Sequence, residues 1–281
     1  MNRLVVITDL DGTLLSHETY DWSPARPAVV ELKRRGIPLV LASSKTRAEI
    51  EVWRERLGNA DPFIVENGGA LFVPTGMLSV ARGTAVEVDG YNRIEFGTPY
   101  ARLRSALPEI AGEVGVPLLG FGDMSREEIG RRTGLKGEDL ERSSRREYDE
   151  PFVPERALSP RDEARLRAAA VARELRVTMG GRFFHLIGQS DKGVAARHLR
   201  TLYTGATGPG VTMMGLGDSA NDLEMLQAVD RPVVVAGPDS AHDPTLRSKL
   251  PRAMFTRLPG PAGFAEAVLA SLDDPGWVGA A

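Results

Sequence analysis

Short apolar runs alternate with amphipathic segments along the N-terminal part of the chain. The runs Leu4–Thr8, Ile37–Ala42 and Phe63–Val65 each end in polar or glycine residues, which is typical of a buried strand followed by a turn. Between them, residues 23–36 and 45–58 carry apolar positions at helical spacing and precede or include a closing glycine. Strands that alternate with helices favour a parallel sheet with helices on both faces.

The starts of these two helices can be predicted from their polar residues. Ser23, which precedes a proline, is the expected N-cap of the first helix. The second helix is expected to open at Lys45 or Thr46, and Ser43 or Ser44 could cap it.

The pattern changes from about Gly83. Hairpins are predicted around Asp89 and around Gly180-Gly181, and they alternate with helical stretches. These stretches lie at residues 103–114, 125–144 and 160–175. Hairpins mixed with helices indicate an inserted α+β unit of ordinary domain size.

The alternation of strands and helices resumes at Lys192. Helices are predicted at 192–199, 223–229 and 262–272, with strands at 211–216 and 233–236, the latter being the last clear strand. We therefore predict an α/β fold: a doubly wound, Rossmann-like parallel sheet from residues 1–83 and 190–281, interrupted by an α+β cap at 84–189. The tail after Asp273 is expected to be loosely held.

Composition narrows the class of protein. The chain of 281 residues is 42% hydrophobic and 26% charged, with a net charge of −3 and no cysteine. No apolar run is long enough for a membrane helix, and the slightly negative net charge does not indicate a basic surface for binding nucleic acid. A cytoplasmic protein with neither a membrane nor a nucleic-acid partner is expected. Only five lysines accompany thirty arginines, so a lysine beside polar motifs is more informative than usual.

Polar residues gather where predicted strands end. Ligands of open α/β sheets bind at the carboxyl ends of the strands, where Asp9, Ser43, Asn67 and Asp218 fall. A dense carboxylate cluster needs a cation, and oxygen ligands without Cys or His favour Mg²⁺. Phosphoryl transfer requires mainly positioning and charge neutralisation, which Mg²⁺ and Lys192 could supply.

Four motifs strengthen this interpretation. VVITDLDGTLL, LASS, SDKG and GLGDSANDLEML, in that order, resemble the motifs of the haloacid dehalogenase (HAD) superfamily phosphatases. An insert between the second and third motifs resembles the branch with a large α/β cap (Cof-like, type IIB). Within that branch SSKT at 43–46, ENGG at 66–69 and REYDEPF at 146–152 are similar to the mannosyl-3-phosphoglycerate phosphatases.

The resemblance implies roles for individual residues. Asp9 would be the nucleophile, and Asp11 the acid and then the base. Ser43 and Lys192 would bind the phosphoryl group. Mg²⁺ would be held by Asp9, the Asp11 carbonyl, Asp218 and Asp222. Ser43 departs from many relatives, which have Thr, and Ser44-Lys45 replaces the usual Gly-Arg.

Further residues are candidates for phosphate or substrate contacts, each with a structural alternative. They are Ser44, Lys45, Asn67, Gly68, Arg142, His185, Gln189 and Asn221. Arg142 lies among acidic residues and could belong to a solvated, salt-bridged helix surface. His185 lies in an apolar strand and could be a satisfied core residue. Asn67 and Gly68 could simply turn the chain.

The expected function is a Mg²⁺-dependent phosphomonoesterase that hydrolyses mannosyl-3-phosphoglycerate through an aspartyl-phosphate. Alternatives are a phosphatase of another sugar phosphate, such as glucosyl-3-phosphoglycerate or sucrose phosphate, a sugar phosphomutase, and a non-catalytic phosphosugar-binding protein. The expected partner is a small phosphosugar; a homodimer remains open.

Overall fold

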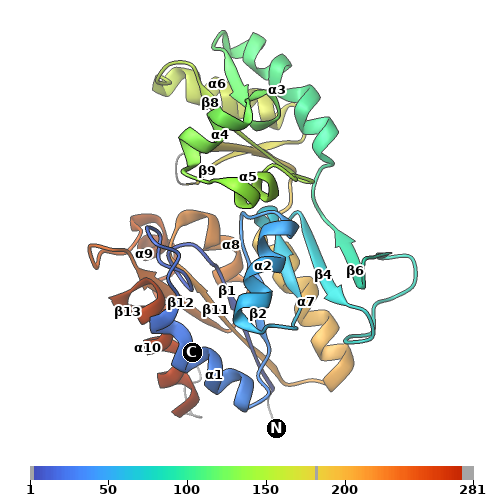
Figure 1. Cartoon of the computed structure of the whole chain (residues 1–281), viewed down its shortest axis with the longest axis vertical. Helices are drawn as coiled ribbons and strands as arrows, with labels where there is room; N and C mark the ends of the chain where they lie inside the picture. The colour runs from blue at the N-terminus through green and yellow to red at the C-terminus, as the bar shows by residue number, and fades with distance from the viewer. Residues whose placement is uncertain (1–2, 181–182, 274–281) are drawn as a thin grey trace.

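The computed structural model describes residues 3–180 and 183–273, and the strands within them form two sheets, one above the other in Figure 1. The larger sheet has nine described strands, in the order β13 (Met254–Pro259), β12 (Arg231–Ala236), β11 (Val211–Gly217), β1 (Arg3–Thr8), β2 (Leu39–Ala42), β3 (Phe63–Val65), β4 (Ala70–Pro74), β6 (Tyr91–Glu95) and β5 (Val86–Val88).

The strands from β13 to β3 are parallel, and β4, β6 and β5 continue the sheet antiparallel. β1 lies between β11 and β2, and its residues Val5, Val6 and Ile7 are fully buried. A parallel strand that is covered on both faces needs a continuous apolar run, which is why this strand could be predicted from the sequence. The predicted α/β fold with a doubly wound sheet is confirmed.

Helices cover both faces of the larger sheet. α1 (Arg26–Arg34), α2 (Arg47–Leu57) and α10 (Gly260–Asp273) contribute to one apolar core. α7 (Lys192–Thr207), α8 (Leu223–Gln227) and α9 (Pro244–Lys249) contribute to the core on the other face. None of the helices among the described residues is long and apolar enough to cross a membrane.

The start of α1 differs from the prediction. Ser23 begins a 3-10 turn, and α1 starts at Arg26 without a side-chain cap. The Ser23 hydroxyl instead donates to Asp21, 2.6 Å away, so its expected N-cap role is wrong.

The start of α2 decides between the predicted caps. Thr46 caps it in a reciprocal capping box with Glu49, so neither Ser43 nor Ser44 is the cap.

The smaller sheet is antiparallel, with the order β7 (Leu118–Gly120), β8 (Asp149–Pro154), β10 (Phe183–Ile187) and β9 (Arg176–Gly180). α3 (Tyr100–Val114) and α6 (Pro160–Val171) bury their apolar faces against it. The short helices α4 (Arg126–Thr133) and α5 (Gly137–Ser143) complete this unit, which is green to yellow in Figure 1. Gly181 of the predicted hairpin turn and the tail after Asp273 lie outside the described residues.

The sequence interpretation missed three elements and misplaced one. β4, α9 and β13 were not predicted, and β13 follows the strand taken as the last clear one. The hairpin of β5 and β6 had been grouped with the cap. It pairs instead with β4 in the larger sheet, whose antiparallel edge extends outward from β3.

The chain enters and leaves the smaller unit at one place. A Cβ added to Gly188 would lie 2.5 Å from Thr98 Oγ1 and 2.8 Å from the Thr98 backbone nitrogen. No side chain fits between these two backbones, so the outgoing and returning connections are in direct contact. Glu147 and Tyr148, between α5 and β8, make a further contact with the larger unit through Glu66.

Candidate active site

Four candidate residues meet at the carboxyl edge of the larger sheet. Asp9 directly follows β1, Ser43 follows β2, and Asp218 follows β11, the three central parallel strands. Lys192 opens α7, which packs on one face of the same sheet. Because parallel strands end at the same edge, residues far apart in the sequence become neighbours there.

Lys192 connects two of the aspartates. Its Nζ lies 2.5 Å from Asp9 Oδ1 and 2.6 Å from Asp222 Oδ1, and all three side chains are buried. Burial alone would lower the pKa of Lys192, but Asp222 and Asp9 outweigh it and hold the pKa above its usual value. The lysine is therefore charged. Asp191 N-caps α7 by accepting from the Val194 N–H, 2.8 Å away, which fixes the position of Lys192.

Three carboxylates form a group suited to a cation. Ligand oxygens of Asp9, Asp218 and Asp222 lie within 4.8 Å of one another. Burial raises the pKa of Asp9 despite Lys192, and Asp222, Asp218 and Asp11 raise it further. One lysine does not balance three carboxylates, so the oxygen-only donor set fits a hard divalent cation, which would stabilise their ionised forms.

Asp218 and Asp222 are held by neighbours. Thr13 Oγ1 donates to Asp218 Oδ1 at 3.0 Å, and the His17 ring lies 3.3 Å from Asp218 Oδ2. The second oxygen of Asp222 accepts from the backbone N–H groups of Asp218 and Ser219. Sequence reasoning missed both residues, although Thr13 lies inside the first motif and His17 lies two residues after it.

Asp11 is partly buried and lies near this group. Its Oδ2 is 3.0 Å from Lys45 Nζ, while its Oδ1 is buried without a hydrogen-bond partner among the described residues. A buried carboxylate oxygen left unpaired is costly, and such atoms cluster at functional sites. Lys45 also lies 4.8 Å above the Tyr20 ring. Burial would lower the Lys45 pKa, but Asp11 and Glu49 hold it above its usual value.

Ser43 is fully buried at the end of β2, and its Oγ accepts from the Lys45 N–H at 3.2 Å. Its carbonyl accepts from the Asn67 N–H at 3.0 Å, which joins this loop to the turn after β3. Asn221 Nδ2 in turn donates to Asn67 Oδ1 at 3.3 Å. Gly68 packs against the start of α7, since a Cβ there would fall 2.2 Å from the Asp191 carbonyl. Gly68 thus has a packing role.

The candidates from the smaller unit do not join the aspartates through any contact among the described residues. Arg142 pairs with Glu138 and Asp139 on its own helix. His185 is buried, with Nδ1 2.8 Å from Asp149 Oδ2, so it is a satisfied buried histidine. Gln189 Nε2 donates to the Leu175 carbonyl at 3.4 Å.

Two buried charges join the units, a role that the sequence interpretation assigned to neither of them. Arg146 Nη1 donates to the Ser44 carbonyl at 2.8 Å and lies 3.6 Å from Asp149. The Glu66 carboxylate accepts from the backbone N–H groups of Glu147 and Tyr148 at 2.8 to 3.1 Å, and burial raises its pKa to about 8. ENGG and REYDEPF contain both residues, but nothing local showed that they meet.

Comparisons with known proteins agree with this architecture. A family described as haloacid dehalogenase-like hydrolase matches residues 6–79. The chain is 41% identical to a glucosyl-3-phosphoglycerate/mannosyl-3-phosphoglycerate phosphatase of Methanococcoides burtonii, over 94% of this chain and 96% of the relative. It is 38% identical to a mannosyl-3-phosphoglycerate phosphatase of Pyrococcus furiosus, over 80% of this chain and 88% of the relative.

Solved structures share the fold. A Thermoplasma acidophilum protein aligns with a TM-score of 0.66 at 18% identity, covering 96% of this chain and 98% of that one. A HAD superfamily phosphatase of Bacteroides thetaiotaomicron aligns with a TM-score of 0.62 at 18% identity, covering 97% and 95%.

Proposed function

The chain belongs to the haloacid dehalogenase-like hydrolase family, and we propose that within it this phosphoric monoester hydrolase is a Mg²⁺-dependent phosphatase of mannosyl-3-phosphoglycerate. The observation that carries the proposal is the buried contact of Lys192 with Asp9 and Asp222, beside Asp218. This arrangement offers a nucleophile, a fixed positive charge and a set of oxygen ligands in one place.

The first step forms a covalent intermediate. An Asp9 carboxylate oxygen attacks phosphorus, and the bond from phosphorus to the leaving oxygen breaks. Asp11 gives its proton to that oxygen, which releases mannosylglycerate and leaves an aspartyl-phosphate on Asp9. The unpaired buried Oδ1 of Asp11 supports its role as the group that exchanges a proton.

The second step returns the site to its starting state. Asp11 takes a proton from a water molecule as the water oxygen attacks phosphorus. The bond to Asp9 breaks, and phosphate leaves. Ser43 donates its hydroxyl hydrogen bond to a phosphoryl oxygen, and Lys192 offsets the charge of the transferred group in both steps.

The metal would be held by the side chains of Asp9, Asp218 and Asp222 and by the Asp11 backbone carbonyl. When bound there, Mg²⁺ supplies positive charge to the phosphoryl oxygens. The inserted unit that carries the smaller sheet acts as a cap and excludes water from the first step by closing over this edge. Arg146 of the inserted unit contacts Ser44 of the larger unit, and Glu66 of the larger unit accepts from Glu147 of the inserted unit. These contacts support a cap that is hinged close to the site.

A panel of phosphate esters tests the function. The purified chain is assayed for phosphate release from mannosyl-3-phosphoglycerate, glucosyl-3-phosphoglycerate, sucrose phosphate and 3-phosphoglycerate, with Mg²⁺ and with a chelator. We expect the highest kcat/KM for mannosyl-3-phosphoglycerate and no turnover with the chelator. The Asp9→Asn protein, prepared identically, controls for contaminating phosphatases. Equal rates across the panel would refute the substrate, and full activity with the chelator would refute the metal.

Glucosyl-3-phosphoglycerate is the second candidate substrate, because the relative from Methanococcoides burtonii carries both sugars in its name. The two substrates differ in the orientation of one sugar hydroxyl. Similar kcat/KM values for the two, well above the other esters, would assign both activities to the chain.

A further inference from the structure

A cavity lies at the amino ends of the central strands, opposite the aspartates. It has a volume of about 470 Å³, within the range of small-molecule sites. Arg3 at the start of β1, Leu39 at the start of β2 and Asp61 before β3 contribute to its wall. β1 has six residues, so at about 3.3 Å per residue the cavity is roughly 20 Å from Asp9. It is therefore separate from the catalytic edge.

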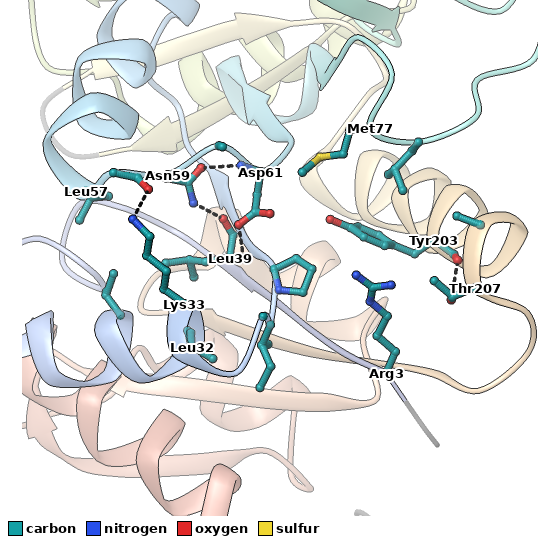
Figure 2. Close-up of a pocket in the computed structure, with 18 residues that line it drawn as sticks. Arg3, Leu32, Lys33, Leu39, Leu57, Asn59, Asp61, Met77, Tyr203 and Thr207 are labelled. Carbon is teal, nitrogen blue, oxygen red and sulfur yellow. Dashed lines mark hydrogen bonds between the residues drawn. The ribbon is translucent and has the colours of Figure 1, made fainter.

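Three polar groups face this cavity without satisfying one another. Figure 2 shows the Tyr203 hydroxyl pointing across it toward Asp61, with the Arg3 guanidinium directed toward the same space. Tyr203 is 2% exposed, and its hydroxyl has no hydrogen-bond partner among the described residues. Leaving a buried hydroxyl unpaired is unfavourable, so a ligand that pairs with it is favoured.

Asp61 is held in place and keeps one oxygen available. Its Oδ2 accepts from the Leu39 N–H at 2.9 Å, and its own N–H donates to Asn59 Oδ1 at 3.2 Å. Asn59 in turn donates to the Leu39 carbonyl at 2.7 Å, and Lys33 Nζ, which also lines the cavity, donates one hydrogen bond to the Gly58 carbonyl at 3.3 Å. Burial raises the pKa of Tyr203, and Asp61 raises it further, so the phenol keeps its proton.

The chemistry of the wall selects the ligand. Asp61 accepts, Arg3 donates, and the Tyr203 hydroxyl does either. Leu32, Leu57 and Met77 add apolar surface to the wall. A phosphate would face the Asp61 carboxylate, and a cation would face Arg3 and Lys33. A neutral ring with several hydroxyls and apolar C–H faces matches all of these groups.

We propose that this cavity is a second binding site, for a neutral, sugar-like polyhydroxylated ligand. Its hydroxyls pair with Tyr203, Asp61 and Arg3, and its C–H faces pack on the apolar wall. Such a ligand has two possible sources, a free sugar or the glycosyl part of the reaction product. The second source rests on the proposed function, and the first does not.

Calorimetric titration of the full chain tests the site with four probes: methyl α-mannoside, methyl α-glucoside, mannosylglycerate and inorganic phosphate. We expect saturable binding of a glycoside to wild type and a Kd about tenfold higher in Tyr203→Phe, since one hydrogen bond is lost. Tyr203→Phe should keep its thermal stability and phosphatase kcat/KM, because the deleted hydroxyl has no protein partner. Asp61→Asn should weaken binding in the same direction.

Tyr91→Phe is the matched control. The Tyr91 hydroxyl accepts from Arg54 at 2.7 Å, so its loss should lower stability and leave glycoside binding unchanged. Binding of mannosylglycerate but of neither methyl glycoside would identify the product as the source. Absence of saturable glycoside binding, or binding that both cavity variants leave unchanged, would overturn the proposal. Glycoside titration needs no turnover, so it fails or succeeds independently of the phosphatase assay.

Discussion

Ion pairs at the carboxyl edge of the larger sheet are buried and join distant parts of the sequence, whereas ion pairs on α5 are exposed and join near neighbours. Lys192 meets Asp9 across 183 positions of sequence and Asp222 across 30, and all three side chains are buried. Arg142 meets Glu138 four positions away on an exposed helix surface. Removing one partner of a buried ion pair costs roughly 3–5 kcal/mol, whereas exposed helical pairs contribute about 0.3–0.5 kcal/mol. Burial and long sequence separation, and not charge density, distinguish the site from the surface.

Asp9→Asn should have the largest effect. The amide cannot attack phosphorus, so kcat should fall by about 10⁴-fold or more. The fold should survive, because Asn has nearly the same volume and Lys192 keeps Asp222. Phosphate release and circular dichroism measure the two effects. Asp139→Asn, an exposed aspartate of α5, is the control, and substantial turnover by Asp9→Asn would contradict the assignment of the nucleophile.

Lys192→Met should reduce both activity and stability. It leaves Asp9 and Asp222 buried without their shared cation, at a cost of roughly 3–5 kcal/mol in unfolding free energy. Urea unfolding and kcat measure the loss. Lys249→Met, on the exposed surface of α9, should change neither quantity. Equal stability of the two variants would show that burial does not separate these lysines.

Glu66→Gln should change how stability depends on pH. The ordinary Glu pKa of 4.5 rises to about 8 in the native protein because of burial. The native state therefore keeps a proton that the unfolded chain releases. The stability from this proton is full below pH 4.5 and is lost as pH rises to about 8.

Gln carries no such proton, so the variant should lack that loss. Between about pH 4.5 and 8 the unfolding free energy of wild type should fall relative to Glu66→Gln by a few kcal/mol. Urea unfolding at several pH values measures it, with the exposed Glu127→Gln as control. Parallel pH profiles for wild type and Glu66→Gln would show that Glu66 is ionised throughout.

Arg142→Ala should have the smallest effect. Its guanidinium pairs with acids on its own helix, and its backbone carbonyl, which accepts from Thr46 Oγ1, is unchanged by the substitution. We expect kcat/KM within about twofold of wild type, as for Arg126→Ala. A large rise in KM for Arg142→Ala alone would instead place its side chain on the substrate.

The fold was predictable where the pattern was strong. The central parallel strands are continuous apolar runs because both of their faces are covered, and such runs can be recognised in a sequence. β13 was missed because Arg257 and Pro259 interrupt it at the edge of the sheet. β4 was missed because it follows Gly68 and Gly69, which read as part of a long turn.

The site was predictable where strand ends alone bring residues together. That Asp9, Ser43 and Asp218 lie close follows from three parallel strands ending at one edge. Arg146 could not be told from Arg142 by its neighbours in sequence, because its contact with Ser44 depends on where the insert packs. The same holds for Glu66, whose partners lie 81 and 82 positions later.

The contact between Thr98 and Gly188 makes the inserted unit a cassette, meaning a segment that could be replaced as a whole. Its two connections leave the larger unit at the same point, so the intervening chain is a loop whose ends already touch. Lengthening such a loop adds little closure entropy, because that entropy grows only logarithmically with length. Residues between the two positions could therefore be exchanged for a unit of different size and surface while the strand ends that carry Asp9, Ser43 and Asp218 stay in register. Changes within the cassette can therefore alter the range of substrates while the catalytic residues of the larger unit stay in place.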